Sequence, residues 1–120
     1  DIPGSSKYFT YGWVTYSNNA KISELAVPAE LIKKHGSVSK EVAEAMAKGA
    51  RKKAKTTFAI GITGIAGPTG GSEQKPVGLV YISVDSDKQC ETKRFIFSHG
   101  REFIRLRAAQ TALNMLRLKL

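Results

Sequence analysis

The stretch TGIAGPTGG, residues 63–71, holds four glycines and one proline, and it directly follows the apolar run Phe58 to Ile62. The next structured segment is VGLVYISVD, residues 77–85, in which apolar side chains alternate as in a strand. A strand therefore precedes and a strand follows the glycine-rich stretch. The residues alone indicate a wide connection within one sheet. They also allow a wall of a binding site, because open α/β sheets bind ligands at the carboxyl ends of their strands.

A phosphate-binding loop is the third reading of this stretch, and its context disfavours it. Such loops open a helix, whose free N–H groups converge on the anion. Here a strand follows. The letters also match neither G-x-x-x-x-G-K-[ST] nor a strand-to-helix G-x-G-x-x-G.

Two further segments have the composition of strands. YGWVTYS, residues 11–17, is rich in aromatic and β-branched residues, which predicts a strand entered through a turn. ETKRFIF, residues 91–97, follows the turn-forming SDK and is expected to pair antiparallel with residues 77–85.

Helix signals fill the remaining chain. Asn18 or Asn19 is expected to cap a short helix to about Leu25, and PAELIKKHG, residues 28–36, predicts a second helix with a glycine stop. Ser39 predicts the N-cap of a longer helix through about Ala54. A last helix is expected from about Arg101. Its predicted apolar face consists of Phe103, Leu106, Ala109, Leu113, Leu116 and Leu120.

The order of elements predicts a single α/β domain over residues 1–120, with a mixed sheet between helices in a three-layer α/β/α arrangement. Its 120 residues, 42% of them hydrophobic, suffice for one core. No apolar run approaches the roughly 18 residues of a membrane span, so a cytoplasmic location is expected. With one cysteine, Cys90, and only His35 and His99, we expect neither a disulfide nor a metal or other cofactor.

The charge balance favours anionic partners. Nineteen Lys and Arg stand against ten Asp and Glu, which gives a formal net charge of +9. Most positive residues lie in or beside predicted helices, and no aromatics are regularly interleaved with them. A solvated helix surface therefore explains them better than a nucleic-acid face.

PGSSKYF, residues 3–9, and VTYSNNAK, residues 14–21, form the candidate catalytic pair. A turn at Pro3 could present Ser5 or Ser6, and Lys21 follows a strand and a turn later, with Tyr16 between. A serine nucleophile needs a base, and a neutral lysine can serve where no histidine is near. The alternative is that the serines cap a turn and Lys21 lies on the surface.

Two arginines open the last helix one turn apart. Arg101 and Arg105 could reach one anion, whose charge also suits that helix end. Taken alone, exposed arginines on an amphipathic helix explain the same pattern.

Together these segments resemble one family. VTYSNNAK, HGSVSKEVAEAMAKGAR, TGIAGPTGGSEQKPVGLVYISV and REFIRLRAAQTAL, in this order, are similar to the C-terminal domain of CinA, the competence/damage-inducible protein, and to the stand-alone nicotinamide-nucleotide amidohydrolases. The glycine loop with its EQKPVG tail is the specific part. The family domain usually begins with a helix and a strand carrying an AESCTGG-like segment, so an N-terminally incomplete domain is expected here.

The resemblance implies metal-free hydrolysis of the carboxamide of nicotinamide mononucleotide to nicotinic acid mononucleotide and ammonia. It implies Ser6 as the nucleophile, Lys21 as its base and Tyr16 as an orienting group. Thr63 and Gly64 would contact the substrate or the oxyanion, a role that suits backbone N–H groups.

The resemblance also implies a phosphate clamp and a homo-oligomer, commonly a dimer. Arg101 is the leading candidate for the 5′-phosphate and Arg105 the second. Neither a membrane nor nucleic acid is an expected partner. The alternative function is a non-catalytic accessory module linked to competence or DNA damage, or a nucleic-acid-binding one.

Overall fold

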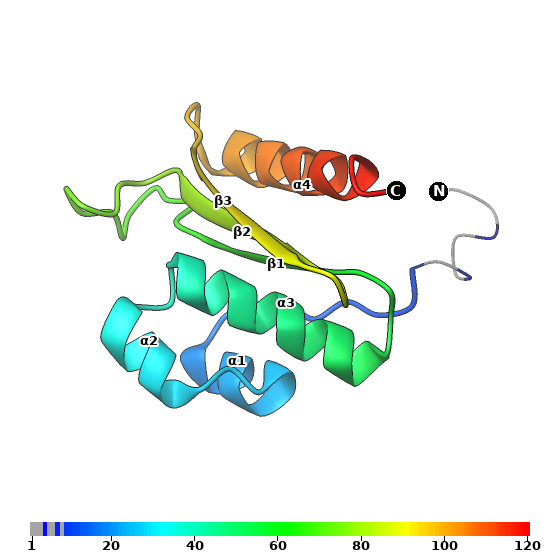
Figure 1. Cartoon of the computed structure of the whole chain (residues 1–120). Helices are drawn as coiled ribbons and strands as arrows, with labels where there is room; N and C mark the ends of the chain where they lie inside the picture. Colours follow the sequence, from blue (N-terminus) through cyan, green and yellow to red (C-terminus); the bar gives the residue numbers. More distant parts are fainter. Residues whose placement is uncertain (1–3, 5–6, 8) are drawn as a thin grey trace.

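The computed structural model describes residues 4, 7 and 9–120 of the chain (Figure 1). Four helices and three strands follow one another in these residues. Their bounds are α1 (Asn18–Leu25), α2 (Ala29–His35), α3 (Lys40–Ala54), β1 (Ala59–Gly64), β2 (Leu79–Asp85), β3 (Cys90–Ile96) and α4 (Arg101–Arg117). The predictions made for Pro3, Ser5 and Ser6 lie outside the described residues.

The helices cover both faces of the sheet. Figure 1 shows α1, α2 and α3 on one face and α4 on the other, so the predicted three-layer α/β/α arrangement is confirmed. The sheet itself has the order β1-β2-β3. Buried apolar side chains form one cluster between the sheet and α4 and a second one in the layer of α1, α2 and α3.

The prediction of a mixed sheet is wrong for the strands described. β1 pairs antiparallel with β2 and β2 antiparallel with β3, with Ile62 opposite Ile82 and Ile82 opposite Lys93. A parallel neighbour requires a crossover connection, commonly a helix. Here loops alone join the consecutive strands, so each strand reverses the direction of the one before.

The prediction of a strand over residues 11–17 is also wrong. This segment has no ladder partner among the described residues, and the side chains of Val14 and Tyr16 are each 80% exposed. Tyr11 instead stacks on Trp13, over which the Lys53 ammonium lies. β-branched and aromatic composition reports that a residue suits a pleated, half-buried surface, but a strand forms only where a neighbour pairs with it.

α3 confirms its predicted start and end. The Ser39 Oγ accepts a hydrogen bond from the Val42 N–H at 3.3 Å, which satisfies a donor of the first turn. The buried stripe of α3 packs on β1 and β2. A Cβ on Gly61 of β1 would collide with the Ala43 carbonyl of α3, so helix and strand approach backbone to backbone.

α4 confirms its predicted start but not its predicted face. The side chains that it buries against the sheet are Ile104, Ala108, Ala112 and Met115. Of the predicted stripe, Leu106, Leu113 and Leu120 are 54%, 63% and 84% exposed. This helix carries apolar residues on most of its sides, so the sequence does not indicate a single buried face. The small Ala108 and Ala112 let the face that includes Ile104 approach β2 closely.

The short helices agree with the sequence apart from one cap. Ser17, rather than Asn18 or Asn19, caps α1, because its Oγ accepts from the Ala20 N–H at 3.0 Å. Gly36 ends α2 with φ of 81°, a conformation that favours glycine, as the predicted glycine stop requires.

Candidate functional site

The glycine loop leaves the sheet at the end of β1 and is closed at its base. The Ile65 N–H donates to the Leu79 carbonyl at 2.9 Å, and the Gly78 N–H donates to the Ile65 carbonyl at 2.6 Å. The loop is therefore anchored to the start of β2 where it begins and ends. Figure 1 shows it extending beyond the sheet at the edge where α4 begins.

Thr63 and the tail of the glycine loop both bind the turn between α2 and α3. The Thr63 Oγ1 donates to the Ser37 carbonyl at 2.7 Å, and the Thr63 residue is only 7% exposed. The Lys75 Nζ donates to the His35 carbonyl at 2.6 Å. The end of β1, the loop and the α2–α3 turn thus form one hydrogen-bonded unit, in which the Thr63 hydroxyl is occupied by the protein itself.

Gly64 presents its backbone to the outer edge of β1. The neighbouring Ile65 N–H points to β2, and amide directions alternate along a strand, so the Gly64 N–H points away from β2. No strand of the described residues pairs on that side. A Cβ at position 64 would lie 2.8 Å from the Leu79 carbonyl oxygen, so glycine is required. Gly64 is exposed, and its N–H is the backbone donor that the predicted site has at this edge of the sheet.

Arg101 joins the start of α4 to the glycine loop. Its Nη1 donates to the Gly67 carbonyl at 3.1 Å, and the side chain is otherwise exposed. Arg105 is exposed one turn further along α4. The structure therefore brings Arg101 to the loop that carries Gly64, and it leaves both guanidinium groups open to solvent.

Lys21 is buried, contrary to the surface alternative. The residue is 7% exposed, and its Nζ donates to the Thr15 carbonyl at 2.5 Å. No carboxylate of the described residues forms an ion pair with it. Desolvation by burial lowers the pKa of Lys21, since burial disfavours the charged form. A lysine in this state can accept a proton closer to neutral pH than an exposed one.

The structure does not bring Tyr16 into contact with this site. Tyr16 follows the acceptor Thr15 in the chain, but its side chain is 80% exposed and has no hydrogen bond to a described residue. Ser6 lies outside the described residues. Lys21 forms no hydrogen bond with Thr63, Gly64 or Arg101.

The sequence did not predict the contacts that Lys75 and Ser37 make around the end of β1. The signal for Lys75 was available in the EQKPVG tail, although a lysine in a loop reads as an exposed charge until its acceptor is known. Ser37 acts through its carbonyl, which no side-chain pattern reveals. The described residues contain no group of three or more His, Cys, Asp or Glu that could hold a metal ion. They also contain no helix both long and apolar enough to cross a membrane.

These features define a class: a small three-layer α/β domain with polar groups from the α2–α3 turn, a glycine loop and the start of α4 at one end of its sheet. The sequence-family model of the CinA C-terminal domain matches residues 1–120 of this chain. The chain belongs to the CinA C-terminal domain family.

Curated relatives and solved structures carry the same family names. A CinA-like protein of Geotalea daltonii is 52% identical over 120 residues, which is 100% of this chain and 29% of that protein. A CinA-like protein of Endomicrobium trichonymphae is 49% identical over the same length, 28% of that protein. The chain thus spans less than a third of these relatives.

Two solved structures have nearly the same fold. The competence/damage inducible protein CihA of Agrobacterium tumefaciens matches with a TM-score of 0.95 at 41% identity, over 98% of this chain and 72% of that one. A CinA superfamily protein of Escherichia coli matches with a TM-score of 0.93 at 31% identity, over 98% of this chain and 69% of that one.

Proposed function

We propose that this domain hydrolyses the carboxamide of nicotinamide mononucleotide to nicotinic acid mononucleotide and ammonia. The observation that supports it most is the buried Lys21, which has no carboxylate partner among the described residues and whose pKa burial lowers. Burial of a lysine without a carboxylate partner costs stability, so its presence in the fold points to a function. Activation of a nucleophile by a desolvated lysine is such a function.

The proposed reaction has two steps. The Ser6 Oγ attacks the carboxamide carbon while Lys21 takes the hydroxyl proton. The tetrahedral intermediate collapses, the C–N bond breaks, and Lys21 returns the proton to the departing ammonia. Water then attacks the acyl-serine, again with Lys21 as base, which releases the carboxylate and restores the Ser6 hydroxyl.

The loop end of the sheet supplies the proposed binding groups. The Gly64 N–H is the proposed oxyanion donor, and Thr63 shapes the wall beside it, because its hydroxyl is already bonded to Ser37. Arg101 is the proposed 5′-phosphate ligand, with Arg105 second. Tyr16 remains a proposed orienting group. A phosphate held at α4 would position the amide without contributing to the chemical step.

The test is ammonia release from nicotinamide mononucleotide by the natural full-length protein that contains residues 1–120. We expect release by the wild-type protein and none above background in Ser6→Ala. Ser5→Ala serves as the matched control, because it removes a neighbouring hydroxyl and distinguishes the two candidate nucleophiles. Absence of release by folded wild-type protein would refute the proposal.

The rival function is an accessory or nucleic-acid-binding module, with which the formal net charge of +9 is compatible. That function predicts no amidase activity and a DNA affinity that falls steeply with salt, since phosphate contacts release counterions. We further propose that the protein forms a homo-oligomer, commonly a dimer in this family. We also propose that it is located in the cytoplasm.

A further inference from the structure

A second polar hollow lies at the opposite end of the sheet from the glycine loop. It is lined by five residues between positions 48 and 56, at the end of α3, and by residues 85–90, the turn between β2 and β3. We call it the hairpin groove. Its volume of about 790 Å³ is within the range of small-molecule sites. Apart from Cys90, every lining side chain is charged, hydroxylic or an amide.

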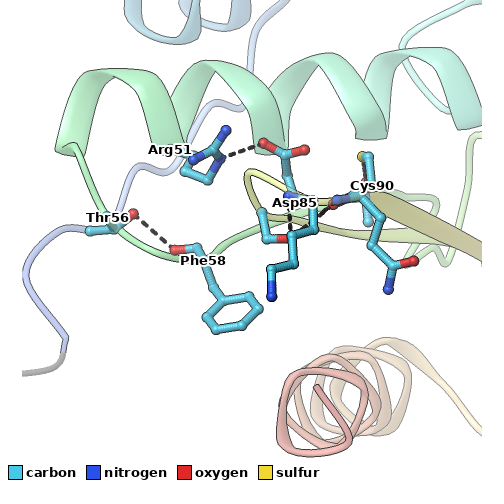
Figure 2. A network of polar contacts seen from close by, with 9 residues as sticks. Arg51, Thr56, Phe58, Asp85 and Cys90 are labelled. Carbon is cyan, nitrogen blue, oxygen red and sulfur yellow. Dashed lines mark hydrogen bonds and ion pairs between the residues drawn. The ribbon is translucent and has the colours of Figure 1, made fainter. Parts of the chain in front are cut away.

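The floor of the hairpin groove is a fixed ion pair. The Arg51 Nε donates to the Asp85 Oδ2 at 2.8 Å, and the Asp85 side chain is only 6% exposed (Figure 2). The Arg51 side chain is 30% exposed, and neither Nη group donates to a described residue. The buried carboxylate therefore holds the guanidinium in place and leaves its two outer nitrogens available to a ligand.

The rim is fixed as well. The Ser86 Oγ accepts from the Lys88 and Gln89 N–H groups, both at 3.3 Å, which closes the turn that carries Lys88. On the α3 side of the groove, the Thr56 Oγ1 donates to the Phe58 carbonyl at 2.9 Å, as Figure 2 shows, which fixes the Thr56 side chain. The backbone of the turn that carries Lys88 and the Arg51 guanidinium are thus held in place before a ligand binds, which lowers the entropy cost of binding at these groups.

The charge of the hairpin groove is unbalanced. Once Arg51 and Asp85 are paired, the lining of the groove holds four lysines and one exposed carboxylate, Asp87. Two of these lysines also border a neighbouring hollow that is lined by Glu41 and Glu44. None of the four forms an ion pair with a described residue. Those four are Lys48, Lys52, Lys55 and Lys88. The partial negative charge at the end of α3, about half an elementary charge, is smaller than this excess.

We propose that the hairpin groove binds the phosphate group of a small ligand, free or as part of a nucleotide. A multiply charged anion suits an excess of three positive charges, and a guanidinium with two free nitrogens suits phosphate oxygens. The basic groups of the groove form a compact set, because the arginines of α4 lie in the other helical layer (Figure 1). A long polyanion would need a continuous basic stripe. This site is separate from Arg101 and does not depend on the proposed amidase.

The experiment is calorimetric titration of the full-length protein with inorganic phosphate and inorganic pyrophosphate at constant ionic strength. Arg101→Ala is the background, so that the anion site proposed at α4 is silenced. We expect saturable binding, tighter for pyrophosphate. We expect Lys52→Glu with Lys88→Glu to weaken pyrophosphate binding tenfold or more, because two positive charges of the groove become negative. Both side chains are exposed, and neither forms a hydrogen bond with a described residue, so the fold should be undisturbed.

The matched control is Lys93→Glu with Arg94→Glu on β3, which makes the same change in net charge at two exposed positions outside the groove. We expect its affinity to stay within twofold of the background protein. Equal weakening in both double variants would reduce the effect to net charge and overturn the proposal, as would the absence of saturable binding. Tighter, strongly salt-dependent binding of a single-stranded oligonucleotide than of pyrophosphate would overturn it in favour of nucleic acid.

Discussion

The two helical layers of this domain differ in how they meet the sheet. On one face, α3 rests on β1 backbone to backbone at Gly61 and buries a single apolar stripe that includes Val42 and Met46. On the other face, α4 buries Ile104 and Met115 and turns Leu106 and Leu113 outward. The α3 layer includes α1, which holds Lys21, and the α4 layer holds Arg101. For the proposed amidase, the comparison suggests a division of labour, with proton transfer by Lys21 on one side of the sheet and binding of the substrate 5′-phosphate by Arg101 on the other.

The strongest test of this division is Lys21→Ala. We expect turnover of nicotinamide mononucleotide to fall about a thousandfold, the middle of the range for loss of a general base, with little change in KM. Steady-state ammonia release gives both constants. Lys53→Ala is the control, because Lys53 is a lysine of the same layer whose Nζ binds Glu24 at the surface. Activity retained in Lys21→Ala would assign proton transfer to another group.

The packing side of the comparison is tested by Ile104→Ala against Leu113→Ala. Ile104 is 3% exposed and Leu113 is 63% exposed on the same helix. We expect Ile104→Ala to lower the free energy of unfolding by about 2–5 kcal/mol and Leu113→Ala by less than about 0.5 kcal/mol. Denaturant titration measures both. Equal losses would mean that α4 is covered on its outer face in the intact protein.

A smaller effect is expected from Arg101→Ala. Loss of one proposed phosphate contact, and of the bond to the Gly67 carbonyl, should raise KM about tenfold, which corresponds to about 1.4 kcal/mol, while kcat changes less. Arg105→Ala should raise KM less than Arg101→Ala. A larger fall in kcat than rise in KM would move Arg101 from binding to chemistry.

The smallest effect is a pH dependence set by Lys21. Burial lowers the pKa of Lys21, so the folded protein binds fewer protons than the unfolded chain between the lowered pKa and the usual one. The free energy of unfolding should therefore rise with pH across that window. Turnover should rise with pH through the lowered pKa, because the neutral amine is the base. In Lys21→Met the contribution of this group to the stability profile should vanish, which denaturant titrations at several pH values would reveal.

The sequence predicted some parts of the fold because their signals are local. Ser39 and Gly36 mark helix ends through groups that lie within one turn, and the structure confirms both. The face of α4 depends on what lies opposite, and a helix with apolar residues on most sides gives no unique answer. Residues 11–17 show the same limit for strands, since pairing requires a neighbour that composition does not name.

The candidate site divides in the same way. The resemblance implied that Gly64 contacts the substrate or the oxyanion, which stays a prediction. Its close approach to the Leu79 carbonyl, where a Cβ would lie 2.8 Å from the oxygen, was not predicted. The sequence marked Lys21, but the burial that lowers its pKa comes from packing of α1 under the rest of the layer. The contacts of Lys75 and Thr63 with the α2–α3 turn join segments far apart in the chain. Such pairs are a property of the folded chain and have no local signature.

The close approach at Gly61 is one of two in the same layer, because a Cβ on Gly49 of α3 would collide with the Leu25 carbonyl of α1. At these two points the backbone of α3 lies directly against the backbones of α1 and β1. Their amides should open to solvent together in native-state hydrogen exchange, and more slowly than the amides of α4. Lys21 then belongs to the part of the domain that opens least often, and the glycine loop is attached to its edge.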